Sequence, residues 1–308
     1  QASARICFGD RCCALPDHFC DFHASDEAER KVGNLSMIES RTQKIIIYIL
    51  LVISAVLVFF PIVFSVALSL SDNMDIANGQ FIPTSLHFEN FVHAFQTQPL
   101  LKYMLNSLVV AVACTVLQII LALLASYAIV FIDFKGKSIL FGLFMATMMI
   151  PSEVLVISNF QTIRSWNLID TFPGLILPSL ASTFGIFLLR QNLKQIPWEL
   201  REAGQMAGVS DFYFFRKVTV PMVKNSIVTL AIYNFLVSWN SYMWPLLSTT
   251  NESVRTVQIG LRQLKNVDGS SDYAMISAGA IIVSIPTLIL IFAGQKRLQE
   301  GLTKGAIK

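Results

Sequence analysis

The chain has 308 residues, of which 54% are hydrophobic and only 14% are charged. Because a soluble domain carries about 25% charged residues, this composition and the mean hydropathy of +0.59 indicate an integral membrane protein. The net charge of +3 is too small to indicate nucleic-acid binding, and in a membrane protein the placement of Lys and Arg matters more than their total.

The first 36 residues differ from the rest of the chain. They are polar, hold four of the five cysteines and lack the apolar stretch of a signal peptide. We interpret residues 1–36 as a non-native or disordered extension and residues 37–308 as the transmembrane domain. A regulatory tail is one alternative. A zinc site is another, although CxxC spacing is absent; its ligands would come from Cys7, Cys12, Cys13, His18, Cys20 and His23.

Apolar segments of bilayer-spanning length follow. They are residues 45–71, 103–132, 138–158, 171–189, 225–247 and 273–294. The prolines within them, such as Pro151 and Pro286, are tolerated because neighbouring helices can satisfy the freed backbone groups. Cys114 lies in the second segment, where packing is its expected role. The sequence therefore predicts an all-α membrane fold with six transmembrane helices and no soluble domain.

The distribution of Lys and Arg predicts the orientation of these helices. Beyond residue 29, 16 of them fall on one side of the predicted membrane and 5 on the other. The positive-inside rule places both termini and the loop of residues 190–224 in the cytoplasm. Trp166, Trp239 and Trp244 then fall near the outer boundary, where interfacial aromatic residues gather.

The longest outer connection, residues 72–102, is rich in phenylalanine. Phe81, Phe88, Phe91 and Phe95 predict a short amphipathic helix that lies at the membrane surface.

No catalytic motif is visible, and we expect the chain not to be an enzyme. Gly136-Lys137-Ser138 resembles the end of a phosphate-binding loop, but Phe131 stands where its first glycine belongs. We therefore expect no cofactor and no metal in this chain, and any ATP must be bound by another subunit. Glu153, the only ionisable residue within the spans, either reaches interfacial water or lines a translocation path.

The cytoplasmic loop has the signals of two short helices. Pro197 suits a helix start, residues 198–207 read as a helix and Gly208 can end it in a left-handed conformation. Ser210 can cap a second helix over residues 211–217. Such short helices persist when they are packed against something, so the loop is either a partner-docking surface or an ordinary surface helix.

The same loop carries a resemblance. Its spacing resembles the EAA loop of bacterial ABC importer permeases, in which Glu-Ala-Ala is followed by Gly and then by Ile-x-Leu-Pro. The matching residues are Glu202-Ala203-Gly204, Gly208, Val218 and Val220-Pro221. Gly204, Val218 and Val220 depart from that pattern, and Ala207 stands where the family often has Asp. Three further segments, residues 187–191, 239–246 and 299–306, are similar to carbohydrate permeases of the maltose and glycerol-3-phosphate type.

The resemblance implies several partners: a second, related permease, two cytoplasmic ATPase subunits and an external solute-binding protein. It also implies that the loop helix rests in a cleft of the ATPase. Glu202 would contact the ATPase, Gly208 would form the turn, and Ala203 and Gly204 would allow close packing. The full set of expected coupling residues is Arg201, Glu202, Ala203, Gly204, Ala207, Gly208 and Pro221, with the charge of Arg201 at the rim.

Sugars are bound by aromatic faces and amide hydrogen bonds, which gives candidates for the substrate path. On the fifth span, helical spacing predicts one face for Phe235, Trp239 and Tyr242. The candidates are Gln118, Glu153, Asn234, Trp239, Asn240 and Tyr242. Ordinary packing and interfacial anchoring are the alternative roles for them.

The predicted function is that of a permease subunit of an ABC importer in the bacterial inner membrane, for an oligosaccharide or sn-glycerol-3-phosphate. The scarcity of buried Lys and Arg favours a neutral sugar. The alternatives are an amino-acid, peptide or metal importer with the same loop, an ion-coupled carrier and a scaffolding membrane protein. The sequence leaves open which carbohydrate is carried and which permease of the pair holds most of the substrate contacts.

Overall fold

A computed structural model of the protein describes residues 41–265 and 272–303, and every regular element in these ranges is a helix. The prediction of an all-α fold is confirmed there. The chain divides into two units, residues 1–62 and 63–308, which are described separately. The boundary predicted at residue 36 and the side chains of the zinc alternative lie outside the described residues.

The described part of the first unit is one apolar helix. Helix α2 (Arg41–Ser69) begins in this unit and ends in the second. Its side chains from Lys44 to Ile62 are all exposed, although almost all of them are apolar. A helix that is apolar on every side suits hydrocarbon rather than water. The first predicted span is thus a helix of bilayer-crossing length, Lys44–Ser69.

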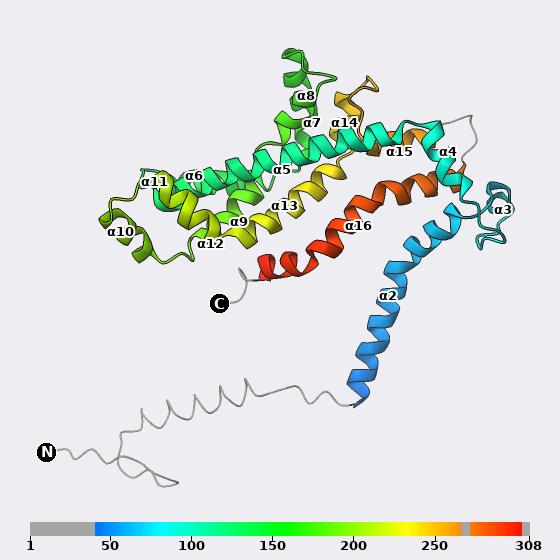
Figure 1. The fold of residues 1–308 in the computed structure, drawn as a ribbon, viewed down its shortest axis with the longest axis horizontal. Coiled ribbons are helices and arrows are strands. Elements are labelled where there is room, and N and C mark those ends of the chain that lie inside the picture. Colours follow the sequence, from blue (N-terminus) through cyan, green and yellow to red (C-terminus); the bar gives the residue numbers. More distant parts are fainter. Residues whose placement is uncertain (1–40, 266–271, 304–308) are drawn as a thin grey trace, which may run out of the picture. The chain divides into compact units, whose positions relative to one another are not determined.

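The second unit is built around one long helix (Figure 1). Its longer elements are α5 (Leu100–Phe131), α9 (Thr183–Leu193), α13 (Lys224–Trp239) and α16 (Tyr273–Thr303). Helices α9 and α13 pack along α5, and α16 packs on α13. Ala122, Leu189 and Leu230, one from each of α5, α9 and α13, lie in the same buried apolar cluster. The second and sixth predicted spans are each one long helix, and Pro286 lies inside the sixth.

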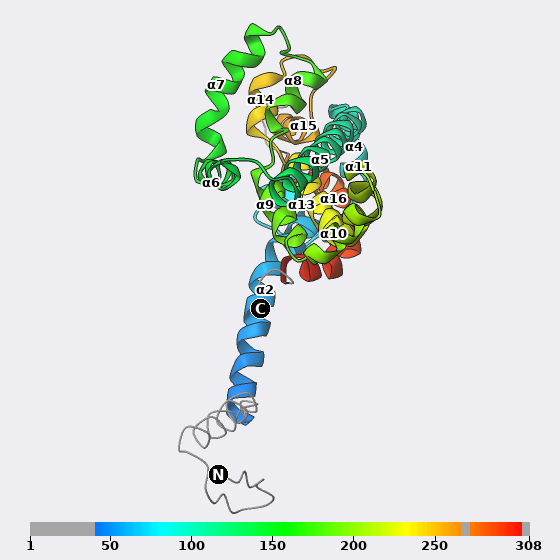
Figure 2. The ribbon, with the colours of Figure 1, turned by 90° about the vertical axis from the view of Figure 1, so that its left-hand side faces the viewer.

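Three further spans are broken. They are α6 (Lys137–Thr147) with α7 (Ser152–Ser165), α8 (Phe172–Ile176) and the 3₁₀ turn η1 (Leu177–Ser179) with α9, and α11 (Asp211–Phe214), the π-helical turn η2 (Phe215–Thr219) and α12 (Val220–Met222) with α13. The bends measure 98°, 49° and 75°, and Figure 2 shows the first of them between α6 and α7. Pro151 lies at that break and explains it, because the proline ring prevents the helix from continuing. Counting each bent pair as one span gives the six that were predicted.

The extent predicted for the fifth span, residues 225–247, is wrong. Helix α13 ends at Trp239, and a separate helix, α14 (Met243–Ser248), follows the break. Pro245 supplies the reason: a continuous helix would place its ring against the carbonyl of Ser241, and proline has no N–H to donate there.

The loop of residues 72–102 holds two short helices instead of the one predicted. They are α3 (Asn73–Ala77) and α4 (Glu89–Thr97). Phe91 and Phe95 lie on α4, but Phe81 lies between the helices. Helix α4 packs on α16, where Ala94 is buried beside Met275. The predicted surface helix is therefore anchored to the bundle by one face.

Helix α15 (Val257–Leu264), between α14 and α16, packs closely on α5. A Cβ added to Gly260 would overlap the ring of Tyr103, which is fully buried. We expect Gly260→Ala to destabilise the protein by about 1–3 kcal/mol, the usual effect of overpacking. Gly142→Ala, in α6 with no atom near the added methyl group, is the matched control and should leave stability unchanged or slightly raised. Apparent melting temperatures in detergent test the pair; equal values for both variants would contradict this packing.

Candidate functional site

The cytoplasmic loop predicted from the sequence folds into a helical hairpin. Helix α10 (Trp198–Met206) begins directly after Pro197, and Gly208 ends it with φ +70°. The predicted end at Ala207 is one residue too late, since Ala207 is the C-cap. Ser210 caps α11 as predicted, accepting a hydrogen bond from the Tyr213 N–H at 3.3 Å. The second helix is shorter than the predicted 211–217, because a π-helical turn replaces its end.

Arg201 lies inside this hairpin and not at its rim, so that expectation is wrong. Its side chain forms an ion pair with Asp211, and the residue is only 4% exposed. The guanidinium also lies 5.1 Å from the ring centre of Phe214. Gly204, one turn further along α10, faces the same ring, since a Cβ there would lie 3.3 Å from it. These two positions pack α10 on α11, because residues i and i+3 share a helix face.

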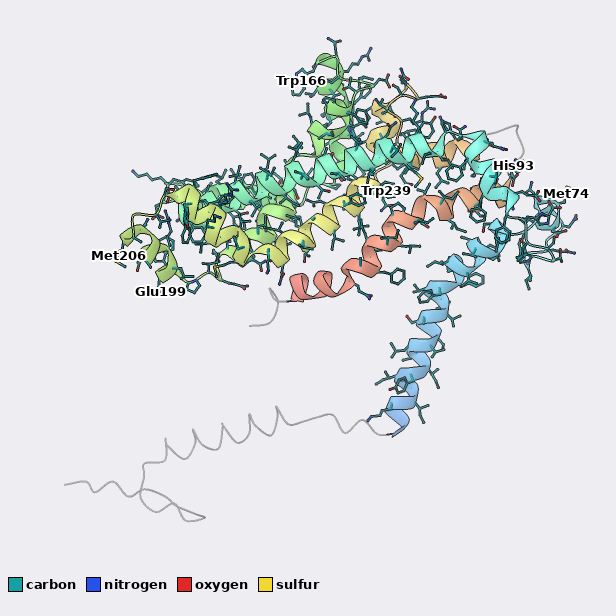
Figure 3. All side chains as sticks on the ribbon, in the orientation of Figure 1. Met74, His93, Trp166, Glu199, Met206 and Trp239 are labelled. Atoms are coloured by element: carbon teal, nitrogen blue, oxygen red, sulfur yellow. The ribbon has the colours of Figure 1, made fainter. Side chains whose placement is uncertain are left out.

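The opposite face of α10 is exposed. Glu202, Ala203 and Ala207 are exposed there, as a docking surface requires. Met206 is 84% exposed, a feature that the sequence analysis missed. Figure 3 shows Met206 and Glu199 at the two ends of α10. Pro221 lies apart from this face, in the turn α12 before α13.

Aromatic contacts join the hairpin to the end of α5. The Phe131 ring stacks on Trp198 of α10 at 6.2 Å and meets Phe214 of α11 edge-on at 5.7 Å. The Tyr127 hydroxyl donates a hydrogen bond of 3.3 Å to the Asp211 carbonyl. The hairpin and the C-terminal end of α5 are therefore held as one packed body.

A cavity of about 800 Å³ lies among α7, α9, α13 and α14, at the broken ends of the spans. Four of the predicted substrate-path residues line it: Gln118, Glu153, Asn234 and Tyr242. The sequence analysis missed several other lining residues that can contact a polar ligand: Asn159, Thr183, Phe184 and Tyr233. They come from three different helices, α7, α9 and α13, so no local pattern could have grouped them.

The polar groups of this cavity are incompletely satisfied. Asn234 is 4% exposed, and its Nδ2 has no hydrogen-bond partner among the residues that the structure describes. Gln118 donates from Nε2 to the Ser179 carbonyl. A buried polar group without a partner is rare, and a bound water or ligand can supply the missing bond. The rings of Phe184 and Tyr233, 4.6 Å apart, add an aromatic wall.

Two candidates, Trp239 and Asn240, lie outside the cavity lining. Trp239 is 2% exposed, and its indole N–H donates to the Val283 carbonyl of α16 at 3.2 Å. It stacks on Phe235 and marks the end of α13 (Figure 3). Asn240 is exposed and donates to the Leu236 carbonyl at 2.8 Å. The predicted shared face with Tyr242 is wrong, because the helix ends before that residue.

Tyr242 is held at the cavity by an arginine. Arg262 of α15 donates a hydrogen bond to its hydroxyl, and the guanidinium carbon lies 5.5 Å from the ring centre. This contact fixes the ring of Tyr242 and occupies the guanidinium of Arg262.

Asp170 joins the loop before α8 to the loop after α14. Its carboxylate accepts hydrogen bonds from the Thr250 N–H at 2.6 Å and the Asn251 N–H at 2.7 Å. Its own N–H donates to the Ser248 carbonyl at 3.0 Å, with φ at +57°. Partial burial raises the pKa of Asp170, but these hydrogen bonds and the charge of Arg255 outweigh it, so the pKa lies below its ordinary value.

Within residues 41–265 and 272–303, no group of three His, Cys, Asp or Glu side chains is arranged to hold a metal ion.

Comparison with known sequences gives consistent matches. The family described as "Binding-protein-dependent transport system inner membrane component" matches residues 118–304. A trehalose transport system permease protein of Mycobacterium tuberculosis is 33% identical over 254 residues, or 80% of this chain and 92% of the relative. An sn-glycerol-3-phosphate transport system permease protein of Yersinia pestis is 33% identical over 276 residues, or 86% and 98%. An arabinooligosaccharides transport system permease protein of Bacillus subtilis is 31% identical over 227 residues, or 73% and 80%.

A solved structure has the same fold. It is a crystal structure of a bacterial ABC transporter involved in the import of the acidic polysaccharide alginate, with a TM-score of 0.75 at 22% identity. The match covers 83% of this chain and 98% of that chain.

The Asp170 link should depend on pH. A carboxylate with a lowered pKa stabilises the fold above its unfolded-state pKa of about 3.9, and that contribution is lost as the pH falls through the folded pKa. We expect Asp170→Asn to lower the melting temperature at neutral pH, and the difference from wild type to shrink only below about pH 4. Asp133→Asn, which removes an exposed surface ion pair with Lys137, is the control and should have little effect. A wild-type advantage that stayed constant into strong acid would refute the assignment.

Proposed function

Because this chain belongs to the family of binding-protein-dependent transport system inner membrane components and is a permease subunit of an ABC importer, we propose that it carries a carbohydrate. It forms half of the translocation path and pairs with a second, related permease. Two cytoplasmic ATPase subunits drive the pair, and an external binding protein delivers the solute. Both termini lie in the cytoplasm, in keeping with the excess of Lys and Arg there.

The cavity beside α13 supports a neutral sugar as the substrate. Amides from Gln118 and Asn234 can bond hydroxyl groups, and the rings of Phe184 and Tyr233 offer apolar faces. No Lys or Arg lines the cavity in the described part of the chain, and Glu153 would repel an anion. The relatives named for trehalose and arabinooligosaccharides favour the same class. Within the carbohydrate class we therefore favour a neutral oligosaccharide over a sugar phosphate.

Helix α10 is the element proposed to couple ATP hydrolysis to transport. The observation that carries this proposal is its two-sidedness: Arg201 and Gly204 bind it to α11, while Glu202, Ala203 and Met206 remain exposed. An ATPase that moved this exposed face would move the end of α5 with it, since Phe131 contacts both helices of the hairpin. Such an element transmits a conformational change when the ATPase and the membrane helices favour the same one of its two states.

Reversal of one exposed charge tests the coupling role. We expect Glu202→Lys to leave membrane insertion intact but to reduce co-purification of the ATPase by about tenfold or more, as loss of an interfacial charge contact does. Glu252→Lys, the same reversal on the side of α14 and α15, is the matched control and should retain the ATPase. Wild-type ATPase yield with Glu202→Lys would rule out this contact. Accumulation of sugar by vesicles that hold both permeases and no ATPase would rule out ATP-driven import.

A second pair of variants tests the cavity. Asn234→Leu keeps the side-chain size but removes the unpartnered amide, so we expect the KM for uptake to rise by up to about tenfold. Asn240→Leu makes the same change outside the cavity and should transport normally. Radiolabelled sugar uptake by the reconstituted importer measures both. If Asn240→Leu were the impaired variant, the cavity beside α13 would not be the path.

A further inference from the structure

A second cavity, of about 560 Å³, shares no lining residue with the first. It is formed where α5 and α9 end and where α6 and α10 begin. These four helix ends lie together at the end of the second unit that carries α11 (Figure 1). Nothing in the transport proposal uses this cavity.

Positive charge exceeds negative charge in its lining. Arg190, Lys194 and Lys137 line it together with one carboxylate, Glu199. Arg190 is held in place by Phe141, whose ring centre lies 3.7 Å from the guanidinium carbon. Its Nε is buried and has no hydrogen-bond partner in residues 41–265 and 272–303. Such a fixed donor without an acceptor is what an anion would satisfy.

The other two cations, Lys137 and Lys194, form few ion pairs within the described part of the chain. Lys137 pairs with Asp133 at 2.8 Å, on the exposed surface. Lys194 is exposed, and its ammonium has no ion-pair partner in the described part of the chain. The hydroxyl of Ser138 and the amide of Gln195 add neutral donors to the same lining. The cavity therefore offers an excess of positive charge and hydrogen-bond donors.

The rest of the lining is apolar, and the cavity borders a lipid-facing surface. Ile129, Val130 and Ile196 line its wall. Helix α6, which starts at the cavity, has no buried residue, and its Ile139 and Leu143 are strongly exposed. An apolar helix exposed in this way lies in hydrocarbon. Trp198, half exposed at the cavity edge, is of the residue type that gathers at the membrane–water interface.

We propose that this cavity binds the headgroup of an anionic phospholipid from the leaflet that faces the ATPase. The lipid phosphate accepts hydrogen bonds from Arg190 and contacts Lys194, while an acyl chain runs along the apolar surface of α6. Basic pockets between membrane helices are known to take such headgroups. This proposal rests on the proposed function only for the leaflet, which is the cytoplasmic one. The bound lipid would tie the start of α10 to the bilayer.

The observations favour lipid over the other anions that the cavity could attract. A free phosphate gains nothing from the apolar wall or from the neighbouring surface of α6. The ATPase surface proposed to contact Glu202 would carry positive charge, which the cations of the cavity at the Glu199 end of α10 would repel (Figure 3).

Photo-crosslinking tests the proposal in the intact importer. The complex would be placed in nanodiscs of phosphatidylcholine that contain a trace of photoactivatable phosphatidylglycerol, and labelled peptides would be identified by mass spectrometry. We expect labelling of residues 190–199 that unlabelled phosphatidylglycerol competes away and inorganic phosphate does not. Arg190→Gln and Lys194→Gln should each lower the apparent lipid affinity by about fivefold, the usual effect of one cation near an anionic lipid. Lys217→Gln, an exposed lysine outside the cavity, is the matched control and should label normally.

Three results would overturn the proposal. Competition by inorganic phosphate at the same concentration would assign the cavity to a free anion. Loss of ATPase co-purification in Lys194→Gln, with labelling absent in wild type, would assign it to the ATPase. Equal labelling of wild type and both variants would show that the cations do not select the lipid. Because labelling needs no transport, failure of this proposal and failure of the transport proposal are separate outcomes.

Discussion

The buried guanidinium of Arg201 is the contact on which the hairpin of α10 and α11 depends. It makes one ion pair and one ring contact, both to α11, and so converts two helices too short to be stable alone into one body. Its Nε and Nη1 have no hydrogen-bond partner within the described residues. A buried ion pair left partly unsatisfied adds little net stability. Its value is geometric: it fixes which face of α10 is turned away from the chain.

At the other end of the second unit, proline decides the architecture. Pro151 separates α6 from α7, and Pro245 prevents α13 from continuing into α14. Each break exposes backbone groups that hydrocarbon cannot satisfy, so broken spans are tolerated where they line a cavity. The large cavity lies among these breaks. Asp170 joins the loop before α8 to the loop after α14. Helix breaks and cavity thus have one cause.

The sequence was sufficient for features that depend on local chemistry. Apolar length located the spans, and Gly208 and Ser210 located the ends of the loop helices, because a left-handed glycine and a capping hydroxyl act on their own neighbours. The sequence did not predict which neighbouring helix a side chain would contact. Trp239 packs on α16 because its indole N–H needs the Val283 carbonyl, 44 residues away. Arg201 is buried because its guanidinium contacts Phe214 and Asp211 of α11. The spacing of residues within α10 does not predict these contacts.

Phe131 connects the features of the inner end. One face of its ring stacks on Trp198, its edge region meets Phe214, and the residue also lines the basic cavity. An occupant of that cavity therefore meets the same aromatic group that holds the Arg201 hairpin on α5. Close-packed rings respond to a neighbour by shifting together, because interiors leave little free volume. Trp198 and Glu199 of α10 line the same cavity, so an occupant can influence this helix through its own first turn as well as through the Phe131 ring.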